Sequence, residues 1–161
     1  MSKRTSVGTP ATVALTGAGV PFAVHTYDHD PSAPSYGMEA ATALGLDPEC
    51  VFKTLLADVD GDLVVAVVPV DGMLDLKALA SAVGGKKAVM ADPARAERTT
   101  GYVVGGISPI GQKRQLRTVV DASAQAHERV YVSGGKRGLD VGLAPGDLVA
   151  VTGGRYGPIA R

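Results

Sequence analysis

Two apolar runs joined by a polar turn form the clearest pattern in the chain. Residues 51–57 and 63–68 are rich in Val, Leu and Ala, and Asp60-Gly61 lies between them. An Asp-Gly pair between two β-rich runs predicts an antiparallel hairpin. Both runs are apolar at odd and even positions alike, so both faces of each strand should be buried. The pattern therefore places this hairpin inside the fold.

Helix start signals recur at several points. Thr9-Pro10, Asp75 and Asp92-Pro93 each place a capping side chain before apolar positions at helical spacing. An Ala-rich stretch that ends at Gly45 and a segment that begins at Pro145 have the same periodicity. The predicted helices cover residues 10–15, 38–44, 76–83, 93–99 and 145–152.

The remaining apolar runs are short and predict strands. Outside the hairpin, the predicted strands cover residues 22–27, 88–90, 117–120, 129–133 and 139–143. Helices and strands are mixed and hairpins dominate, which predicts an α/β (α+β) fold with a mostly antiparallel, barrel-like mixed sheet and flanking short helices. No repeat or long linker divides the chain, so residues 9–161 are expected to form one domain after a flexible tail over residues 1–8.

Charge is balanced overall but segregated along the chain. The sequence has 16 basic and 16 acidic residues. Residues 28–75 carry ten acids and one base, Lys53, whereas residues 86–140 carry ten bases and five acids. Phosphate contacts depend on local charge, so the basic half could hold a polyanion on one face. A solvated surface of mixed charge is the alternative.

Composition excludes several classes of protein. The sequence has no apolar run of about 18 residues and no export signal after Met1, which predicts a cytoplasmic protein without membrane contact. Its one cysteine, Cys50, cannot form an internal disulfide and has no base placed beside it. Five Tyr, two Phe and no Trp are few for a surface that stacks unpaired bases.

Lys53 interrupts a strand that is otherwise apolar. Removing water from an ammonium is costly, so this side chain must reach carboxylates, carbonyl groups or a polar cavity. Two interpretations stay open. The ammonium could serve a substrate carbonyl or phosphate inside a pocket. Alternatively, the side chain extends to solvent or forms a structural ion pair.

Residues 101–109, the glycine loop, are the second candidate site. Gly105-Gly106 allows close approach of a ligand to the backbone, and Pro109 stiffens the end of the loop. Backbone N–H groups presented in this way can polarise a carbonyl. A plain turn is the alternative. The spacing differs from GxGxxG and does not support a dinucleotide site.

Residues 133–138 (SGGKRG) only superficially resemble a phosphate-binding loop. They lack the GxxxxGK[ST] frame and lead into a predicted strand, so we interpret them as a hairpin turn that carries two cations. In the following strand Leu139 and Val141 share one face, which places Asp140 on the other. If that face meets the cavity of Lys53, Asp140 would pair with the ammonium or with a substrate amine.

Metal sites are not indicated. His25 and His29 have a zinc-like spacing, but they bracket a predicted strand instead of sharing a helix. Residues 58–62 resemble the start of a calcium loop, but the glycine falls one residue early and the bidentate Glu is missing. We therefore expect no metal and no cofactor.

Five segments, which follow one another in the family's order along the chain, carry a resemblance to a known family. The resemblance spans about residues 10–156, and the segments that carry it are residues 25–30 (HTYDHD), 52–56 (FKTLL), 90–93 (MADP), 100–109 (TGYVVGGISP) and 131–140 (YVSGGKRGLD). In these segments the chain resembles the YbaK/EbsC family of aminoacyl-tRNA deacylases, relatives of the editing domain of prolyl-tRNA synthetase. The resemblance implies the editing-domain fold and a free-standing enzyme that removes cysteine from mischarged Cys-tRNA(Pro), and also from Cys-tRNA(Cys). It further implies the tRNA acceptor end as partner and prolyl-tRNA synthetase as a candidate docking partner.

The resemblance also implies roles for individual residues. The catalytic set is Lys53, Gly105 and Gly106. The residues expected to bind substrate are Tyr27, Tyr36, Thr54, Ile107, Ser108, Pro109 and Asp140. Relatives often have Phe at the position of Tyr36.

An aminoacyl ester is already activated, and a cysteine substrate carries its own nucleophile. Correct positioning of an intramolecular attack can supply roughly 7 to 11 kcal/mol without a nucleophile from the protein. We therefore expect thiol-assisted ester cleavage. The basic pairs expected to contact tRNA phosphates are Lys86-Lys87, Lys113-Arg114 and Lys136-Arg137. Two alternatives stay open: a non-catalytic module that binds tRNA or the synthetase, and a deacylase for another small amino acid.

Overall fold

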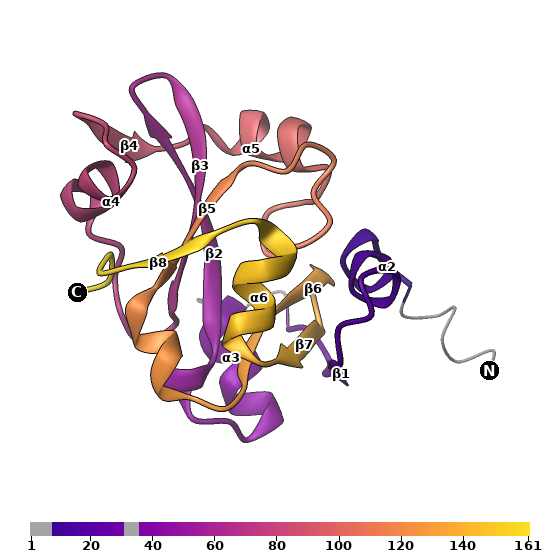
Figure 1. Ribbon diagram of the computed structural model, residues 1–161. Coiled ribbons are helices and arrows are strands. Elements are labelled where there is room, and N and C mark those ends of the chain that lie inside the picture. Colours follow the sequence, from indigo (N-terminus) through magenta and orange to yellow (C-terminus); the bar gives the residue numbers. More distant parts are fainter. Residues whose placement is uncertain (1–7, 31–35) are drawn as a thin grey trace.

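Two β-sheets and a set of short helices make up the computed structural model, which describes residues 8–30 and 36–161 (Figure 1). The three-stranded sheet has the order β1-β7-β6, and the five-stranded sheet has the order β4-β2-β3-β5-β8. The strands are β1 (Ala23–Thr26), β2 (Phe52–Val59), β3 (Asp62–Pro69), β4 (Ala88–Met90), β5 (Arg117–Asp121), β6 (Val130–Lys136), β7 (Leu139–Leu143) and β8 (Arg155–Gly157).

The predicted central hairpin is confirmed. Strands β2 and β3 pair antiparallel, with Asp58 opposite Leu63. Asp60 and Gly61 both have positive φ angles, 52° and 97°, as a tight two-residue hairpin turn requires. The Asp58 carboxylate accepts a hydrogen bond from the Gly61 N–H over 2.7 Å and stabilises the turn. This hairpin is the centre of the five-stranded sheet.

Both faces of the hairpin are buried, as the sequence predicts. Val65 and Val67 belong to a core that also contains β6, β7 and α6 residues, including Val132 and Leu148. The alternate residues of β3, such as Ala66, belong to a second core on the opposite face of the sheet, beneath α4. A strand with two buried faces needs apolar side chains at every position.

The helices are α2 (Pro10–Gly17), α3 (Tyr36–Leu44), α4 (Leu76–Ala82), α5 (Pro93–Thr100) and α6 (Pro145–Thr152). The three predicted capping residues act as caps. The side chains of Thr9, Asp75 and Asp92 accept hydrogen bonds from backbone N–H groups in the first turns of α2, α4 and α5. These bonds satisfy donors that have no partner within the helix. No helix in the described part of the chain is long and apolar enough to cross a membrane.

The expectation of a closed, barrel-like sheet is wrong, although the α/β class and the mostly antiparallel pairing are confirmed. Strand β5 pairs in parallel with both β3 and β8. Within the described ranges, the two sheets are joined edge to edge only by an isolated bridge between Val51 and Tyr131. Strands β2 and β6 separate beyond this bridge, so the barrel does not close.

Three short elements were not predicted. They are the 3₁₀ helices η1 (Pro48–Cys50) and η2 (Ala122–Ala126) and the strand β8. The Asp121 side chain binds the backbone of η2 and of the segment that follows β8. One carboxylate oxygen accepts hydrogen bonds from the N–H groups of Ile159 and Ala160, and the other accepts one from Ser123. Burial raises the pKa of Asp121, but these hydrogen bonds outweigh it and hold the pKa below its usual value.

Candidate active site

A gap along the outer edge of β2 positions the candidate site. One edge of β2 pairs with β3 over its whole length. The other edge is bridged to β6 at Val51 and pairs with β4 from Ala57 onward. Between these points, residues 52–55 have no strand partner on that edge among the described residues. Backbone and side chains of this segment therefore face the space between the two sheets.

A cavity of about 370 Å³ occupies this gap. Its walls come from β2, from the glycine loop, from the ends of β4 and α5, and from the three-stranded sheet. The cavity brings together seven residues that the sequence singled out, which are Tyr27, Lys53, Thr54, Gly105, Ile107, Lys136 and Asp140. These residues are up to 113 positions apart in the chain, from Tyr27 to Asp140.

Lys53 is half-buried in the wall of this cavity. It forms no ion pair or hydrogen bond with another residue of the described ranges. The structural ion pair that we considered from the sequence is therefore not observed there. The ammonium remains available to a molecule in the cavity.

Asp140 faces the same cavity from β7 and is 6% exposed. Burial raises the pKa of its carboxyl from 3.8 to about 7. Its neighbours on the two adjacent strands are His25 and Ser133, and directly opposed residues of antiparallel strands project from the same face. Ser133 also lines the cavity, although no pattern in the sequence singles it out. Ser133 could be identified only from the fold, because its pairing opposite Asp140 is not visible in the sequence.

Thr54 and Tyr27 add two hydroxyl groups to the cavity. The Oγ1 atom of Thr54 is buried and has no hydrogen-bond partner in the part of the chain that the structure describes. Burial, together with the negative charges of Asp140 and Glu39, raises the pKa of Tyr27 to about 12. The phenol therefore stays protonated at neutral pH and can donate a hydrogen bond.

The two adjacent glycines of the glycine loop differ in their surroundings and in the partners of their N–H groups. The N–H of Gly106 donates to the carbonyl of Val103 over 2.9 Å. A Cβ atom on Gly106 would lie 2.8 Å from Cα of Lys136, so this glycine allows the loop to pack against the β6–β7 turn. Gly105 lines the cavity with a φ of 91°, and its N–H has no hydrogen-bond partner in the described ranges. Of the two, Gly105 is the one that can present an N–H to a substrate.

Two further residues of the predicted substrate set, Ser108 and Pro109, are not in the cavity wall. Ser108 is fully buried, and its hydroxyl accepts a hydrogen bond from the N–H of Ile110 over 3.1 Å. Pro109 is buried beside it. Tyr36 begins α3, and its side chain lies outside the described residues. Substrate contacts by these three residues stay predictions.

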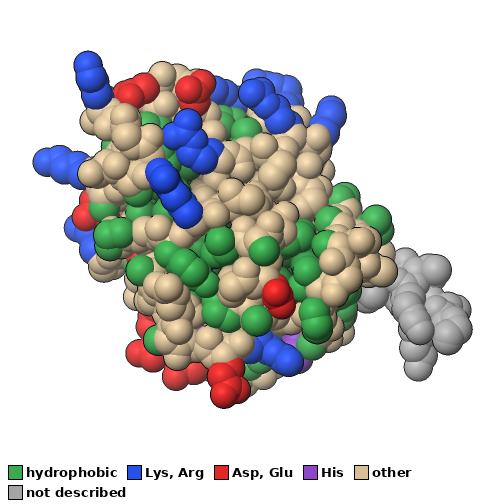
Figure 2. All heavy atoms as spheres, in the orientation of Figure 1, with side chains coloured by type: hydrophobic (Ala, Val, Ile, Leu, Met, Phe, Trp, Pro, Cys, Tyr) green, Lys and Arg blue, Asp and Glu red, His purple; other side chains and the backbone are tan. Residues whose placement is uncertain are grey.

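The basic residues are divided between two environments. Lys86, Lys87, Lys113 and Arg114 are exposed. Most of the Lys and Arg side chains on the face shown in Figure 2 lie in its upper half, where some acidic side chains lie among them, and further acidic side chains lie along its lower left edge. Lys136 instead lines the cavity, and the guanidinium of Arg137 donates to the carbonyl of Val104. These two residues are therefore part of the site's surroundings.

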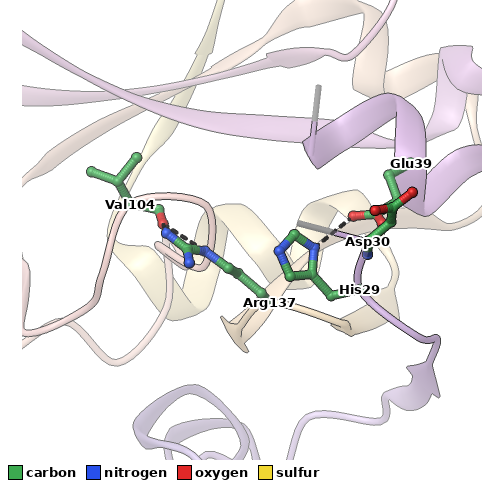
Figure 3. A network of polar contacts seen from close by, with 5 residues as sticks. All are labelled: His29, Asp30, Glu39, Val104 and Arg137. Atoms are coloured by element: carbon green, nitrogen blue, oxygen red, sulfur yellow. Dashed lines mark hydrogen bonds and ion pairs between the residues drawn. The ribbon is translucent and has the colours of Figure 1, made fainter. Parts of the chain in front are cut away.

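The two histidines considered as metal ligands have separate contacts. His29 pairs with Glu39, with Nδ1 and Oε1 2.9 Å apart (Figure 3). The ring of His25 packs edge-on against Tyr131, with ring centres 5.4 Å apart. Within residues 8–30 and 36–161, no three His, Cys, Asp or Glu side chains form a group that could hold a metal ion.

Comparison with known proteins identifies relatives for most of the chain. Residues 30–151 match the family model of the aminoacyl-tRNA editing domain. The chain is 43% identical over 121 residues to the candidate Cys-tRNA(Pro)/Cys-tRNA(Cys) deacylase EbsC of Enterococcus faecalis, a match that covers 74% of this chain and 73% of that protein. It is 30% identical to the multifunctional Ser/Thr-tRNA deacylase ProXp-y of Escherichia coli K12, over 66% of this chain and 64% of that protein.

Solved structures share the fold. One is the crystal structure of a candidate trans-editing enzyme for prolyl-tRNA synthetase. It superimposes with a TM-score of 0.77 and 22% identity, over 96% of this chain and 99% of that one. At this identity the likeness concerns the fold and leaves the chemistry to be argued from the site.

Proposed function

The chain belongs to the aminoacyl-tRNA editing domain family, and we propose that it is a trans-editing deacylase that removes cysteine from Cys-tRNA(Pro). The cavity carries this proposal. It combines a lysine that forms no ion pair with any described residue, a buried carboxyl, and a glycine N–H beside the segment of β2 that has no described strand partner on its outer edge. We further propose that residues 9–161 form the catalytic domain.

The groups in the cavity complement a cysteinyl ester. In our proposal the N–H of Gly105 and the ammonium of Lys53 bind the ester carbonyl and the terminal ribose, where negative charge develops during the reaction. Asp140 and the hydroxyl of Thr54 bind the substrate's amino group. Tyr27 and Ile107 form the remaining wall around the side chain. A buried site of this kind strengthens each of these polar contacts.

No protein nucleophile is needed for the cleavage. The cysteine thiol of the substrate loses its proton, and its sulfur attacks the carbonyl carbon of its own ester. The bond between that carbon and the 3′ oxygen then breaks, and the 3′ oxygen takes up a proton. The products are free tRNA and a cyclic thioester, which water opens to cysteine. The site contributes orientation, which can be worth roughly 7 to 11 kcal/mol in such reactions.

The tRNA is the partner that this reaction requires. We propose that the exposed Lys86, Lys87, Lys113 and Arg114 contact phosphates of the acceptor stem, while Lys136 lies close enough to the cavity to contact the terminal nucleotide. Prolyl-tRNA synthetase is a candidate docking partner because a protein of the same fold is described as its trans-editing enzyme. We propose that the protein acts in the cytoplasm, where aminoacyl-tRNAs are used.

A second candidate is a deacylase for serine or threonine esters. It is favoured by the likeness to ProXp-y, which is a Ser/Thr-tRNA deacylase. The higher identity to EbsC and its larger coverage favour cysteine. A serine ester would need an activated water, because a hydroxyl is a much poorer nucleophile than a thiolate at neutral pH.

The test uses the purified full chain and proline tRNA charged with cysteine, alanine or proline. Loss of the ester is followed over time for each substrate. We expect rapid loss of cysteine and slow loss of alanine and proline. Equal loss of all three would contradict the assigned specificity, and no loss of the cysteinyl ester would contradict the proposed Cys-tRNA(Pro) deacylase.

A further inference from the structure

The carbonyl oxygen of Val104 is bound by a guanidinium from a distant part of the chain. Nε and Nη2 of Arg137 donate hydrogen bonds to it over 3.0 and 2.5 Å (Figure 3). Arg137 lies in the turn between β6 and β7, 33 positions further along the sequence. The contact therefore fixes the glycine loop to the three-stranded sheet.

The peptide group on the other side of Val104, between Val103 and Val104, is also bound by a charged side chain. Its N–H donates to Oε2 of Glu97 on α5 over 2.8 Å. Val104 is therefore bound through its N–H by an anion and through its carbonyl by a cation. The two side chains come from different elements, so the peptide groups on both sides of Val104 have defined orientations.

One of these peptide groups determines where the Gly105 N–H points. The hydrogen bond from Gly106 N–H to Val103 carbonyl closes a four-residue turn, and the φ of 91° at Gly105 is typical of a type II turn. Type I and type II turns differ mainly in the orientation of the central peptide, here Val104-Gly105. A trans peptide is planar, so its carbonyl and its N–H point in opposite directions.

From this geometry we infer that Arg137 is a positioning residue that holds the Gly105 N–H toward the cavity. The guanidinium binds one end of the Val104-Gly105 peptide and thereby directs the other end away from itself. Gly105 is the loop glycine that lines the cavity, and its N–H has no partner in the described ranges. A cation on the carbonyl also polarises the peptide and strengthens its N–H as a donor.

This inference rests on the proposed function, and it replaces the sequence-based expectation for Arg137. An exposed arginine in a basic half is expected to bind phosphate. Two of its N–H groups, however, are committed to Val104. If Arg137 bound a phosphate, its removal would weaken tRNA binding, whereas removal of a positioning residue would slow the chemical step.

The test compares three variants of the full chain in single-turnover deacylation of Cys-tRNA(Pro). Arg137→Met removes the guanidinium, Arg137→Lys retains one cationic donor, and Arg161→Met is the control at an exposed arginine. For Arg137→Met we expect the rate at saturating enzyme to fall about 10- to 100-fold, with unchanged half-saturation and salt dependence. Arg137→Lys should be intermediate and Arg161→Met unchanged. A raised half-saturation with an unchanged rate, or no effect of Arg137→Met, would overturn the inference.

A second readout does not depend on activity. The amide resonance of Gly105 is recorded by ¹H–¹⁵N NMR in the free protein, and the rest of the spectrum shows whether each variant is folded. Relative to the wild type, we expect a selective shift of Gly105 in Arg137→Met and no shift in Arg161→Met. If the wild type cleaves no aminoacyl-tRNA, the proposed function fails, and the Gly105 resonance still decides whether Arg137 orients the peptide.

Discussion

Lys53 and Asp140 line one cavity from two different sheets without forming an ion pair with each other. Strand β2 carries the lysine and β7 carries the aspartate. An amine and a carboxyl that could pair with each other do not do so, at a position where residues 52–55 of β2 have no described strand partner on their outer edge. Such an arrangement suits a ligand that brings both an oxygen-rich group and an amine.

Replacement of Lys53 tests the role of the ammonium. For Lys53→Ala we expect the deacylation rate to fall by about 10²- to 10³-fold, because a charge aimed at the developing oxyanion is removed. The thermal unfolding midpoint should change little, since the lysine forms no ion pair with a described residue. Lys77→Ala, at an exposed position of α4, is the matched control and should retain full activity. Wild-type rates in Lys53→Ala would remove the ammonium from the mechanism.

Asp140 should make stability depend on pH. Its pKa is about 7 in the folded protein and 3.8 without burial, so the folded state holds the proton more tightly. This contribution to stability is complete below pH 3.8 and is lost as the pH rises to about 7. For Asp140→Asn, the free energy of unfolding relative to wild type should therefore rise by up to about 4 kcal/mol between pH 4 and pH 8.

Chemical denaturation of both proteins across this pH range measures the effect. Comparison of the two curves removes the contribution of carboxyls whose pKa is lowered, such as Asp121 and Glu39, because they are common to both. A difference between the two proteins that is constant with pH would show that Asp140 is not buried as described.

The exposed basic pairs should determine the salt dependence of tRNA binding. Replacement of Lys86-Lys87 or Lys113-Arg114 by alanine should weaken binding and reduce the slope of log K against log salt by about 0.7 to 0.9 for each phosphate that the protein no longer neutralises. The cleavage rate at saturation should not change. A Lys77→Ala/Arg161→Ala double variant removes the same charge elsewhere and should leave the slope unchanged. Unchanged slopes in both basic-pair variants would contradict the assigned surface.

Gly106 should tolerate no side chain. The Cβ of Gly106→Ala would lie 2.8 and 2.9 Å from backbone atoms of Lys136 and Arg137, so the loop or the turn must shift. We expect a loss of about 1 to 3 kcal/mol in the free energy of unfolding. Gly146→Ala in α6 is the control: its Cβ meets no atom within 4 Å. It should gain up to about 1 kcal/mol, since alanine is a better helix former. Similar stabilities for the two variants would contradict the packing described for Gly106.

Most helices and strands of the fold could be predicted from short stretches of sequence. The Asp60-Gly61 turn and the caps at Thr9, Asp75 and Asp92 could be predicted because each depends on residues within about four positions. Strand β8 could not, because Arg155–Gly157 is too short to show alternation and is held by parallel pairing with β5, which is distant in the sequence. Sheet closure also depends on contacts that no local pattern encodes.

In the candidate site, too, some features could be predicted from the local sequence and others depend on contacts between distant segments. Lys53 could be selected because a charge within an apolar strand is visible in the sequence. Motif resemblance then connected it with Asp140, and the fold places both at one cavity. The roles of Gly105 and Gly106 could not be separated in advance, because one depends on a hydrogen bond within the loop and the other on a distant turn. The contact of Arg137 with Val104 joins two loops that the sequence treats as unrelated.

The most direct test of the central claim compares Cys-tRNA(Pro) with Ser-tRNA(Pro), two substrates that differ by one atom, sulfur or oxygen. Decay of both esters is measured under single-turnover conditions with the same enzyme preparation. If the substrate's own thiol breaks the bond, the cysteinyl ester should decay at least about 100-fold faster. Equal rates, or faster loss of serine, would contradict thiol-assisted cleavage and show that the cavity activates water instead.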